Sequence, residues 1–174
     1  DRVVIHIGEG RRGNEQVEEE WDTLRALAGG CLLEPDHAGK LVLIHGNFTR
    51  ETLEQIAALG DSPEDHPIII WSPSSNTDLY GWNAEASLDV PYALSLGIRV
   101  ALGPDWRPSH GIGMITEINS ARAYAGDFFP SGSVNDEELF RMATIHGAYA
   151  AGLQDDIGRL ETGMLADIAI IKGG

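Results

Sequence analysis

Two histidines and one aspartate each follow a run of apolar residues, and side chains of these types can bind a metal ion. His6 and His45 end runs of Val, Leu and Ile, and Asp105 follows a third run after Gly103-Pro104. Neutral imidazole nitrogen and carboxylate oxygen are ordinary ligands of zinc and iron. If the folded chain brings the three side chains together, they suit a divalent metal of the zinc or iron type.

A fourth apolar run also ends in polar residues. Pro67-Ile68-Ile69-Ile70-Trp71 leads into Ser72-Pro73-Ser74-Ser75-Asn76, so each of these predicted strands delivers polar groups at its C-terminal end. A parallel α/β barrel builds its active site in this way, whereas an open doubly wound sheet concentrates its site at one switch point. The pattern therefore favours a barrel.

The predicted elements alternate between strands and helices. The strands are nearly continuous Val, Ile and Leu, which indicates a parallel sheet covered on both faces. A closed eight-stranded barrel needs about 250 residues, so four strand-plus-helix units correspond to half of one. We expect strands over residues 2–7, 40–44, 66–71, 98–102 and 166–171. We expect helices over residues 15–28, 90–96, 112–124 and 136–153, the last of them capped by Asn135 or Asp136, and a further helix capped by Thr49. Residues 72–82 should form a loop.

Composition limits the classes of function. The chain has 174 residues, 43% of them hydrophobic, which is enough for one sizeable core. A net charge of −15 argues against a nucleic acid or an anionic membrane as partner, because either needs a basic patch. The lone Cys31 excludes an internal disulfide framework, and no apolar stretch reaches the roughly 18 to 20 residues that span a bilayer. We expect a soluble, cytoplasmic protein.

An ordered set of short motifs resembles the second half of the barrel in the amidohydrolase superfamily. The resemblance covers almost the whole chain and is strongest to the branch of cytosine and guanine deaminases, chlorohydrolases and imidazolonepropionases. It implies strands 5 to 8 of a (β/α)8 TIM barrel over residues 1–155, and a turn and one strand of a small β-sandwich over 156–174. The motifs are His6-Ile7-Gly8-Glu9, His45-Gly46, Ser72-Pro73-Ser74-Ser75-Asn76, Leu102-Gly103-Pro104-Asp105-Trp106, and Ile157-Gly158-Arg159-Leu160-Glu161-Thr162-Gly163 with Ala166-Asp167-Ile168.

The resemblance implies roles for four of these residues. His6 corresponds to the strand-five metal ligand, and Asp105 to the strand-eight aspartate that binds the metal and takes a proton from water. His45 corresponds to the strand-six histidine, which binds a second metal or polarises water or substrate. Glu9 matches the acid of the family's His-x-x-Glu motif, but it reaches the site only if the backbone turns at Gly8, because positions 6 and 9 of a regular strand face opposite sides.

Simpler roles stay open for the same residues. His6 and His45 could be hydrogen-bonded rim histidines, Asp105 could cap a turn, and Glu9 could belong to a solvated loop. Ser75, Asn76 and Trp106 are the candidate substrate contacts, with loop formation as the alternative for Ser75 and Asn76. We interpret the acidic run over residues 18–20 as a solvated helix face and His110 as a surface loop residue.

The family's first-strand His-x-His pair is absent from this sequence. We therefore expect the chain to be incomplete as a catalyst, and two functions stay open. One is the C-terminal half of a metal-dependent hydrolase that attacks a C–N bond of a small substrate. The other is a non-catalytic half barrel, or pseudoenzyme, that serves as a folding or interaction module. Half a barrel exposes sheet edges and an apolar inner face, so we expect it to pair with the missing N-terminal half or with a second copy.

Overall fold

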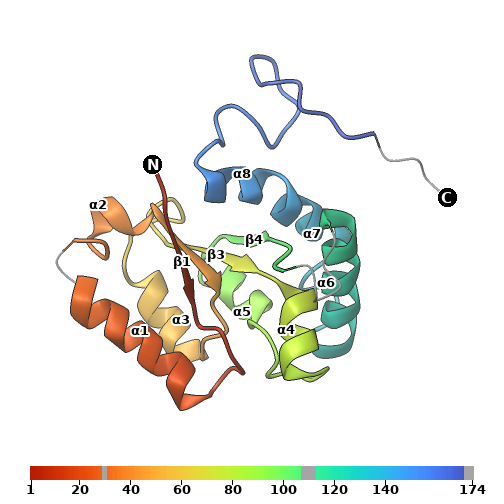
Figure 1. Cartoon of the computed structure of the whole chain (residues 1–174). Helices are drawn as coiled ribbons and strands as arrows, with labels where there is room; N and C mark the ends of the chain where they lie inside the picture. Colours follow the sequence, from red (N-terminus) through yellow and green to blue (C-terminus); the bar gives the residue numbers. More distant parts are fainter. Residues whose placement is uncertain (29–30, 107–112, 171–174) are drawn as a thin grey trace.

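A computed structural model describes residues 1–28, 31–106 and 113–170 of the chain. Its four-stranded sheet consists of β1 (Val3–Ile7), β2 (Leu41–His45), β3 (Ile68–Trp71) and β4 (Val100–Leu102). All strands are parallel and lie in the order β1-β2-β3-β4, as Figure 1 shows. This order never reverses, so the sheet lacks the switch point of a doubly wound fold. The prediction of a barrel-type parallel arrangement is confirmed.

Helices connect the strands and cover one face of the sheet. Thr49 caps α3 by accepting a hydrogen bond from the Thr52 backbone N–H, and Asn135 caps α7 in the same way from Glu138, so both predicted caps are confirmed. The helices are α1 (Glu15–Ala28), α2 (Pro35–Ala38), α3 (Arg50–Ala57), α4 (Pro73–Tyr80), α5 (Val90–Ser95), α6 (Met114–Phe128), α7 (Asp136–Ala143) and α8 (Ile145–Ala151).

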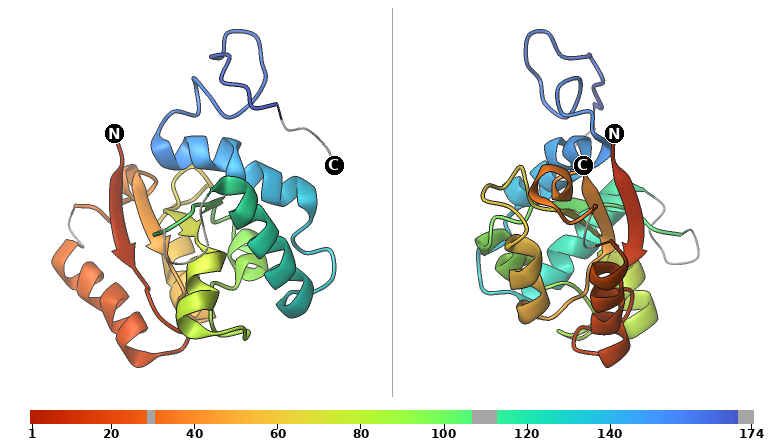
Figure 2. Two further views of the ribbon diagram at one scale, coloured as in Figure 1. Left: turned by 45° about the vertical axis from the view of Figure 1, so that its right-hand side comes forward. Right: turned by 90° about the vertical axis from the view of Figure 1, so that its left-hand side faces the viewer.

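The two faces of the sheet belong to two hydrophobic clusters. Leu41 and Leu43 of β2 pack with the helices in the larger cluster. Val42, which alternates with them, belongs to a smaller cluster that includes Ala150 of α8. Helix α8 lies across the end of the sheet at which the strands begin (Figures 1 and 2). The opposite end, where the strands finish, carries the polar residues.

The expected loop over residues 72–82 is wrong, because most of it forms α4. Pro73 stands in the first turn, where its fixed φ suits a helix and its missing N–H costs nothing. The backbone N–H of Ser74 donates to the Glu117 carboxylate at 3.0 Å, so a side chain distant in sequence satisfies a free donor of the first turn. This long-range contact gives no local signal in the sequence.

The long helix expected over residues 136–153 is also wrong, because it is two helices. Thr144 adopts φ −122° and ψ −90°, which ends α7 and starts α8 in a new direction. His146 of α8 then hydrogen-bonds the Val100 carbonyl at 2.8 Å, which ties α8 to the start of β4. The break lets α8 cover the end of the sheet.

The strand expected over residues 166–171 is not formed in its described part. Residues 166–170 have no regular structure and are exposed, and the segment that follows α8 extends away from the helices (Figure 1). A strand requires hydrogen bonds from a neighbouring strand, and the four-stranded sheet does not include this segment. Within the described ranges, no helix is long and apolar enough to cross a membrane.

Candidate metal centre

His6, His45 and Asp105 meet at the end of the sheet where the strands finish. Each offers one ligand atom, and the three atoms lie within 4.8 Å of one another. The two imidazole rings have centroids 5.6 Å apart. His45 is buried, whereas His6 is exposed. The expectation that these side chains converge is confirmed.

The donor set and its spacing fit zinc. Two ligands of one zinc ion, each bonded at about 2.0 to 2.2 Å, lie at most about 4.4 Å apart. Small rotations of the exposed His6 side chain would bring the three atoms from 4.8 Å into that range. Two imidazoles and one carboxylate leave room in a tetrahedral shell for a water molecule or a further ligand.

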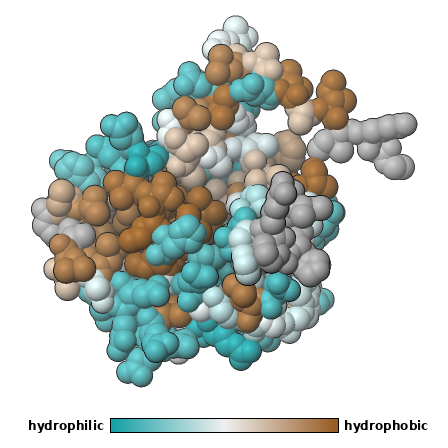
Figure 3. Space-filling model, viewed as in Figure 1, coloured by the Kyte–Doolittle hydropathy of each residue, from teal (hydrophilic) through white to brown (hydrophobic). Residues whose placement is uncertain are grey.

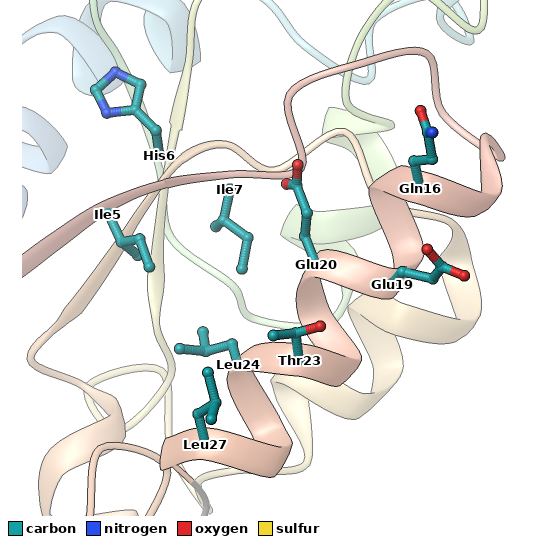
Figure 4. Close-up of a pocket in the computed structure, with 9 residues that line it drawn as sticks. All are labelled: Ile5, His6, Ile7, Gln16, Glu19, Glu20, Thr23, Leu24 and Leu27. Carbon is teal, nitrogen blue, oxygen red and sulfur yellow. The ribbon is translucent and has the colours of Figure 1, made fainter.

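An unusual backbone angle at His45 brings the two histidines together. In a parallel sheet, residues paired in register point to the same face, and His45 is paired with Ile7, whereas His6 is paired with Ile44. Figure 4 shows that Ile7 points toward α1 and His6 points the other way. A regular strand would therefore separate the two histidines. His45 has a φ of +77°, in the left-handed region, and this turn redirects its side chain.

The residue after His45 allows this turn. Gly46 also has a positive φ, and a Cβ atom there would lie only 2.7 Å from Cγ2 of Ile69. Any larger residue would collide with β3. The left-handed backbone at His45 costs on the order of 1 to 3 kcal/mol, and such strain is typical of functional sites.

Asn76 fixes the orientation and the tautomer of His45. Its Oδ1 lies 3.1 Å from His45 Nδ1, while its Nδ2 donates to Asn47 Oδ1 at 3.1 Å and to Ser87 Oγ at 3.0 Å. Because Oδ1 can only accept, Nδ1 carries the proton. The unprotonated Nε2 is then the nitrogen that can bind a metal or accept a proton.

Ser75 holds Asp105. The Ser75 hydroxyl donates to Asp105 Oδ2 at 2.6 Å and is fully buried. This contact occupies one carboxylate oxygen and leaves the other for a metal or for a water proton. Ser75 and Asn76 are adjacent in α4, so one short helix orients both Asp105 and His45.

A buried carboxylate anchors the start of that helix. Glu117 of α6 is 0% exposed and accepts from the Ser74 hydroxyl at 2.5 Å as well as from the Ser74 backbone. Burial raises the pKa of Glu117, the two hydrogen bonds from Ser74 act in the opposite direction, and the charge of Asp105 adds to the rise. The charge of Asp105 thus acts on Glu117, although Glu117 is not one of the three candidate ligands.

Glu9 is exposed and is not among the three residues whose ligand atoms converge. Gly8 adopts a φ of +71°, so the backbone leaves the regular strand conformation just before Glu9. Burial raises the pKa of Tyr80, and the charges of Glu9, Asp105 and Glu20 act in the same direction. Glu9 and Asp105 therefore influence one phenol from two different loops.

The structure changes several expectations about single residues. Ser75 and Asn76 are 0% exposed, so they orient other side chains and do not reach a substrate in this conformation. Trp106 is 50% exposed at the rim, and His110 lies outside the described residues. The acidic run is not simply solvated, since Glu18 accepts hydrogen bonds from Thr49 and Thr52 and Glu20 accepts one from the Gly8 backbone.

Sequence reasoning missed Glu117, Asn47 and Ser87. A signal existed for Glu117, because it shares one helical face with Ala121 and Tyr124, which are buried. A carboxylate on the apolar face of a helix suggests a specific buried partner. Asn47 and Ser87 stand in loops and carry no comparable periodic signal.

Comparisons with known proteins agree with this geometry. A family model described as the amidohydrolase family matches residues 41–173. A 5-methylthioadenosine/S-adenosylhomocysteine deaminase from Teredinibacter turnerae is 33% identical over 98% of this chain, and one from Pyrococcus furiosus is 29% identical over 98%. The chain spans only 36% and 38% of the lengths of these two relatives.

Solved structures share the fold. An adenosine deaminase from Xanthomonas campestris with bound zinc superposes with a TM-score of 0.72, at 21% identity over 95% of this chain and 36% of its own. An atrazine chlorohydrolase from Arthrobacter aurescens complexed with zinc gives 0.68, at 22% identity over 95% of this chain and 34% of its own. The four-stranded sheet is therefore part of a larger barrel-like fold in these proteins.

Proposed function

Because the chain belongs to the amidohydrolase family, we propose that it forms strands five to eight of a zinc-dependent hydrolase that releases ammonia from a small cyclic amidine. The observation that carries the proposal is the convergence of His6, His45 and Asp105 within 4.8 Å. The names of the deaminase relatives support an amino-substituted purine ring as the substrate class. Iron is the alternative metal, since the same ligands suit it.

The residues divide the chemistry among them. His6, His45 and Asp105 would hold the zinc ion, which when bound lowers the pKa of water to about 7 and polarises the reacting carbon. Asp105 has one oxygen free of the Ser75 hydrogen bond, and this oxygen would either bind the metal or accept the proton of the attacking water. In this proposal, Glu9 would deliver a proton to the substrate or its leaving nitrogen.

We further propose that the preceding half of a barrel completes the site. Strand β1 is an edge strand, and its Val3 and Val4 are 42% and 56% exposed. Figure 3 shows an apolar surface over this part of the molecule. In a closed eight-stranded barrel, strand four would pair with β1, and strand one, which carries the family's His-x-His pair, would pair with β4.

A groove beside β1 supports this completion. It has a volume of about 400 Å³ and lies between β1 and α1, with Ile5, Leu24 and Leu27 among its lining residues (Figure 4). Leu27 stands at helical spacing after Val17, Trp21 and Leu24 of α1, and Val17 and Trp21 are buried, yet Leu27 is 83% exposed. The helix of a preceding β/α unit would cover Leu27 and fill the groove.

The test uses the protein with whatever sequence flanks residues 1–174 in its gene. Loaded with zinc, it should release ammonia from 5′-methylthioadenosine or a related aminopurine, and Asp105→Asn should abolish turnover without unfolding the protein. Asp22→Asn, on the exposed side of α1, is the matched control. Full activity of the Asp105→Asn variant would refute the assignment, and failure of the parent protein to bind zinc would favour the non-catalytic half barrel.

A further inference from the structure

A second hollow lies at the end of the sheet opposite to the metal centre. Its volume is about 460 Å³, and its lining includes Arg99 next to β4, Arg141 of α7 and Arg159 of the segment after α8. His146 and Tyr149 of α8 complete its polar side. Three guanidinium groups from three separate segments thus border one space.

The lining of this hollow is rich in arginine, although the chain as a whole is acidic. The sequence has 27 acidic residues and 12 Lys and Arg residues, so an average surface hollow should be acidic. Three of the 12 cations line this one, and none of the described residues that line it is acidic. The lining itself therefore contributes three positive charges on a protein with a net charge of −15.

Arg99 is held by an aromatic ring and has only a long ion pair with Glu64. Its guanidinium carbon lies 3.8 Å from the centroid of the Tyr149 ring, and its side chain is 13% exposed. A carboxylate oxygen of Glu64 lies 3.9 Å from Arg99 Nη2, which is within ion-pair range but longer than a hydrogen bond. Stacking on the ring leaves the in-plane N–H groups of a guanidinium available to an anion.

The other carboxylates near the hollow lie outside its lining. Glu161 accepts a hydrogen bond from Arg159 Nε at 2.6 Å, but its side chain is 60% exposed. Exposed ion pairs of this kind contribute about 1 kcal/mol or less, so an anion can compete with them. A carboxylate oxygen of Glu138 lies 3.9 Å from His146 Nδ1, but Glu138 does not line the hollow.

The guanidinium groups act together on one buried side chain. Burial lowers the pKa of His146, and the charges of Arg141 and Arg99 act in the same direction, against the Val100 carbonyl and Glu138. Two arginines from different segments therefore lie close enough to His146 for their charges to act on it.

We propose that this hollow binds the phosphate group of a small phosphorylated molecule. A phosphate dianion accepts bidentate hydrogen bonds from several guanidinium groups at once, whereas a carboxylate engages fewer. The apolar residues Leu94, Ile98 and Ile145 form the rest of the wall and accommodate the body of such a ligand. The hollow lies at the end of the sheet away from His6, His45 and Asp105, so this ligand is not the substrate of the proposed hydrolase.

The test is calorimetric titration with inorganic phosphate and pyrophosphate at constant ionic strength, on the protein with its natural flanking sequence. Binding should saturate at one ligand per chain, and Arg141→Ala and Arg159→Ala should each weaken it about tenfold. These two side chains are exposed, so their removal should leave the fold intact. Arg122→Ala, which breaks an exposed pair with Asp136, is the control and should bind like the parent protein.

Three results would overturn the proposal. They are the absence of saturable binding, equal weakening by Arg122→Ala and by the two pocket variants, and equal affinity for chloride and phosphate. None of them bears on zinc binding or ammonia release, so this site and the proposed function fail or stand separately.

Discussion

Ser75 donates a hydrogen bond to Oδ2 of Asp105 at 2.6 Å, across 30 positions of sequence. Ser75 is fully buried, and its hydroxyl leaves only the other oxygen of the carboxylate free of this hydrogen bond. A group that orients a metal ligand typically affects metal affinity or activity by a factor of 10 to 100. Ser75 is therefore a positioning residue with a measurable contribution.

We expect Ser75→Ala to weaken zinc binding by about tenfold or more, because Asp105 loses the contact that fixes its carboxylate. Competition with a chromogenic chelator measures this affinity directly. Ser95→Ala is the control, since Ser95 is exposed and bonds only the Tyr92 carbonyl among the contacts described. Unchanged zinc affinity in Ser75→Ala would contradict the positioning role.

Asn76→Ala should reduce both stability and zinc affinity. The substitution removes the partner of His45 Nδ1 and leaves the buried Asn47 and Ser87 side chains short of a hydrogen bond. Each buried polar group left unpaired costs about 1 to 3 kcal/mol of the free energy of unfolding. Urea denaturation and chelator competition would report the two losses, and Asn119→Ala, at an exposed position of α6, should show neither.

Glu117→Ala should act on the metal centre from a distance. Ser74 would lose both of its acceptors, and the start of α4, with Ser75 and Asn76, would no longer be fixed. We expect a loss of about 1 to 3 kcal/mol in stability and a fall of about tenfold in zinc affinity. The control is Glu137→Ala in the exposed first turn of α7. A variant that lost stability but kept full zinc affinity would show that Glu117 is structural only.

His146 makes stability depend on pH. Its pKa in the folded protein lies below the ordinary value of 6.5, chiefly because it is buried. As pH falls through 6.5, the unfolded chain takes up a proton before the folded chain does, so stability is lost from there down to the folded pKa. His146→Gln should remove this part of the pH dependence. Urea denaturation between about pH 5 and pH 8, with a chelator present to exclude metal binding, tests the difference in slope.

Local patterns in the sequence predicted the four parallel strands, two helix caps and the types of ligand. Runs of Val, Ile and Leu predict buried parallel strands because burial on both faces leaves no polar alternation. The caps at Thr49 and Asn135 are equally local, since each side chain bonds a backbone N–H three residues later. The family motifs added the choice of His6, His45 and Asp105.

The way in which the three ligands are held depends on contacts between residues far apart in sequence. Strand alternation alone would place His45 on the Ile7 face, away from His6, and the left-handed turn that corrects this depends on the close approach of Gly46 to Ile69. Helix α4 likewise depends on Glu117, 43 positions after Ser74. Both features rest on contacts between residues far apart in sequence, and such contacts leave no periodic pattern that a single sequence can reveal.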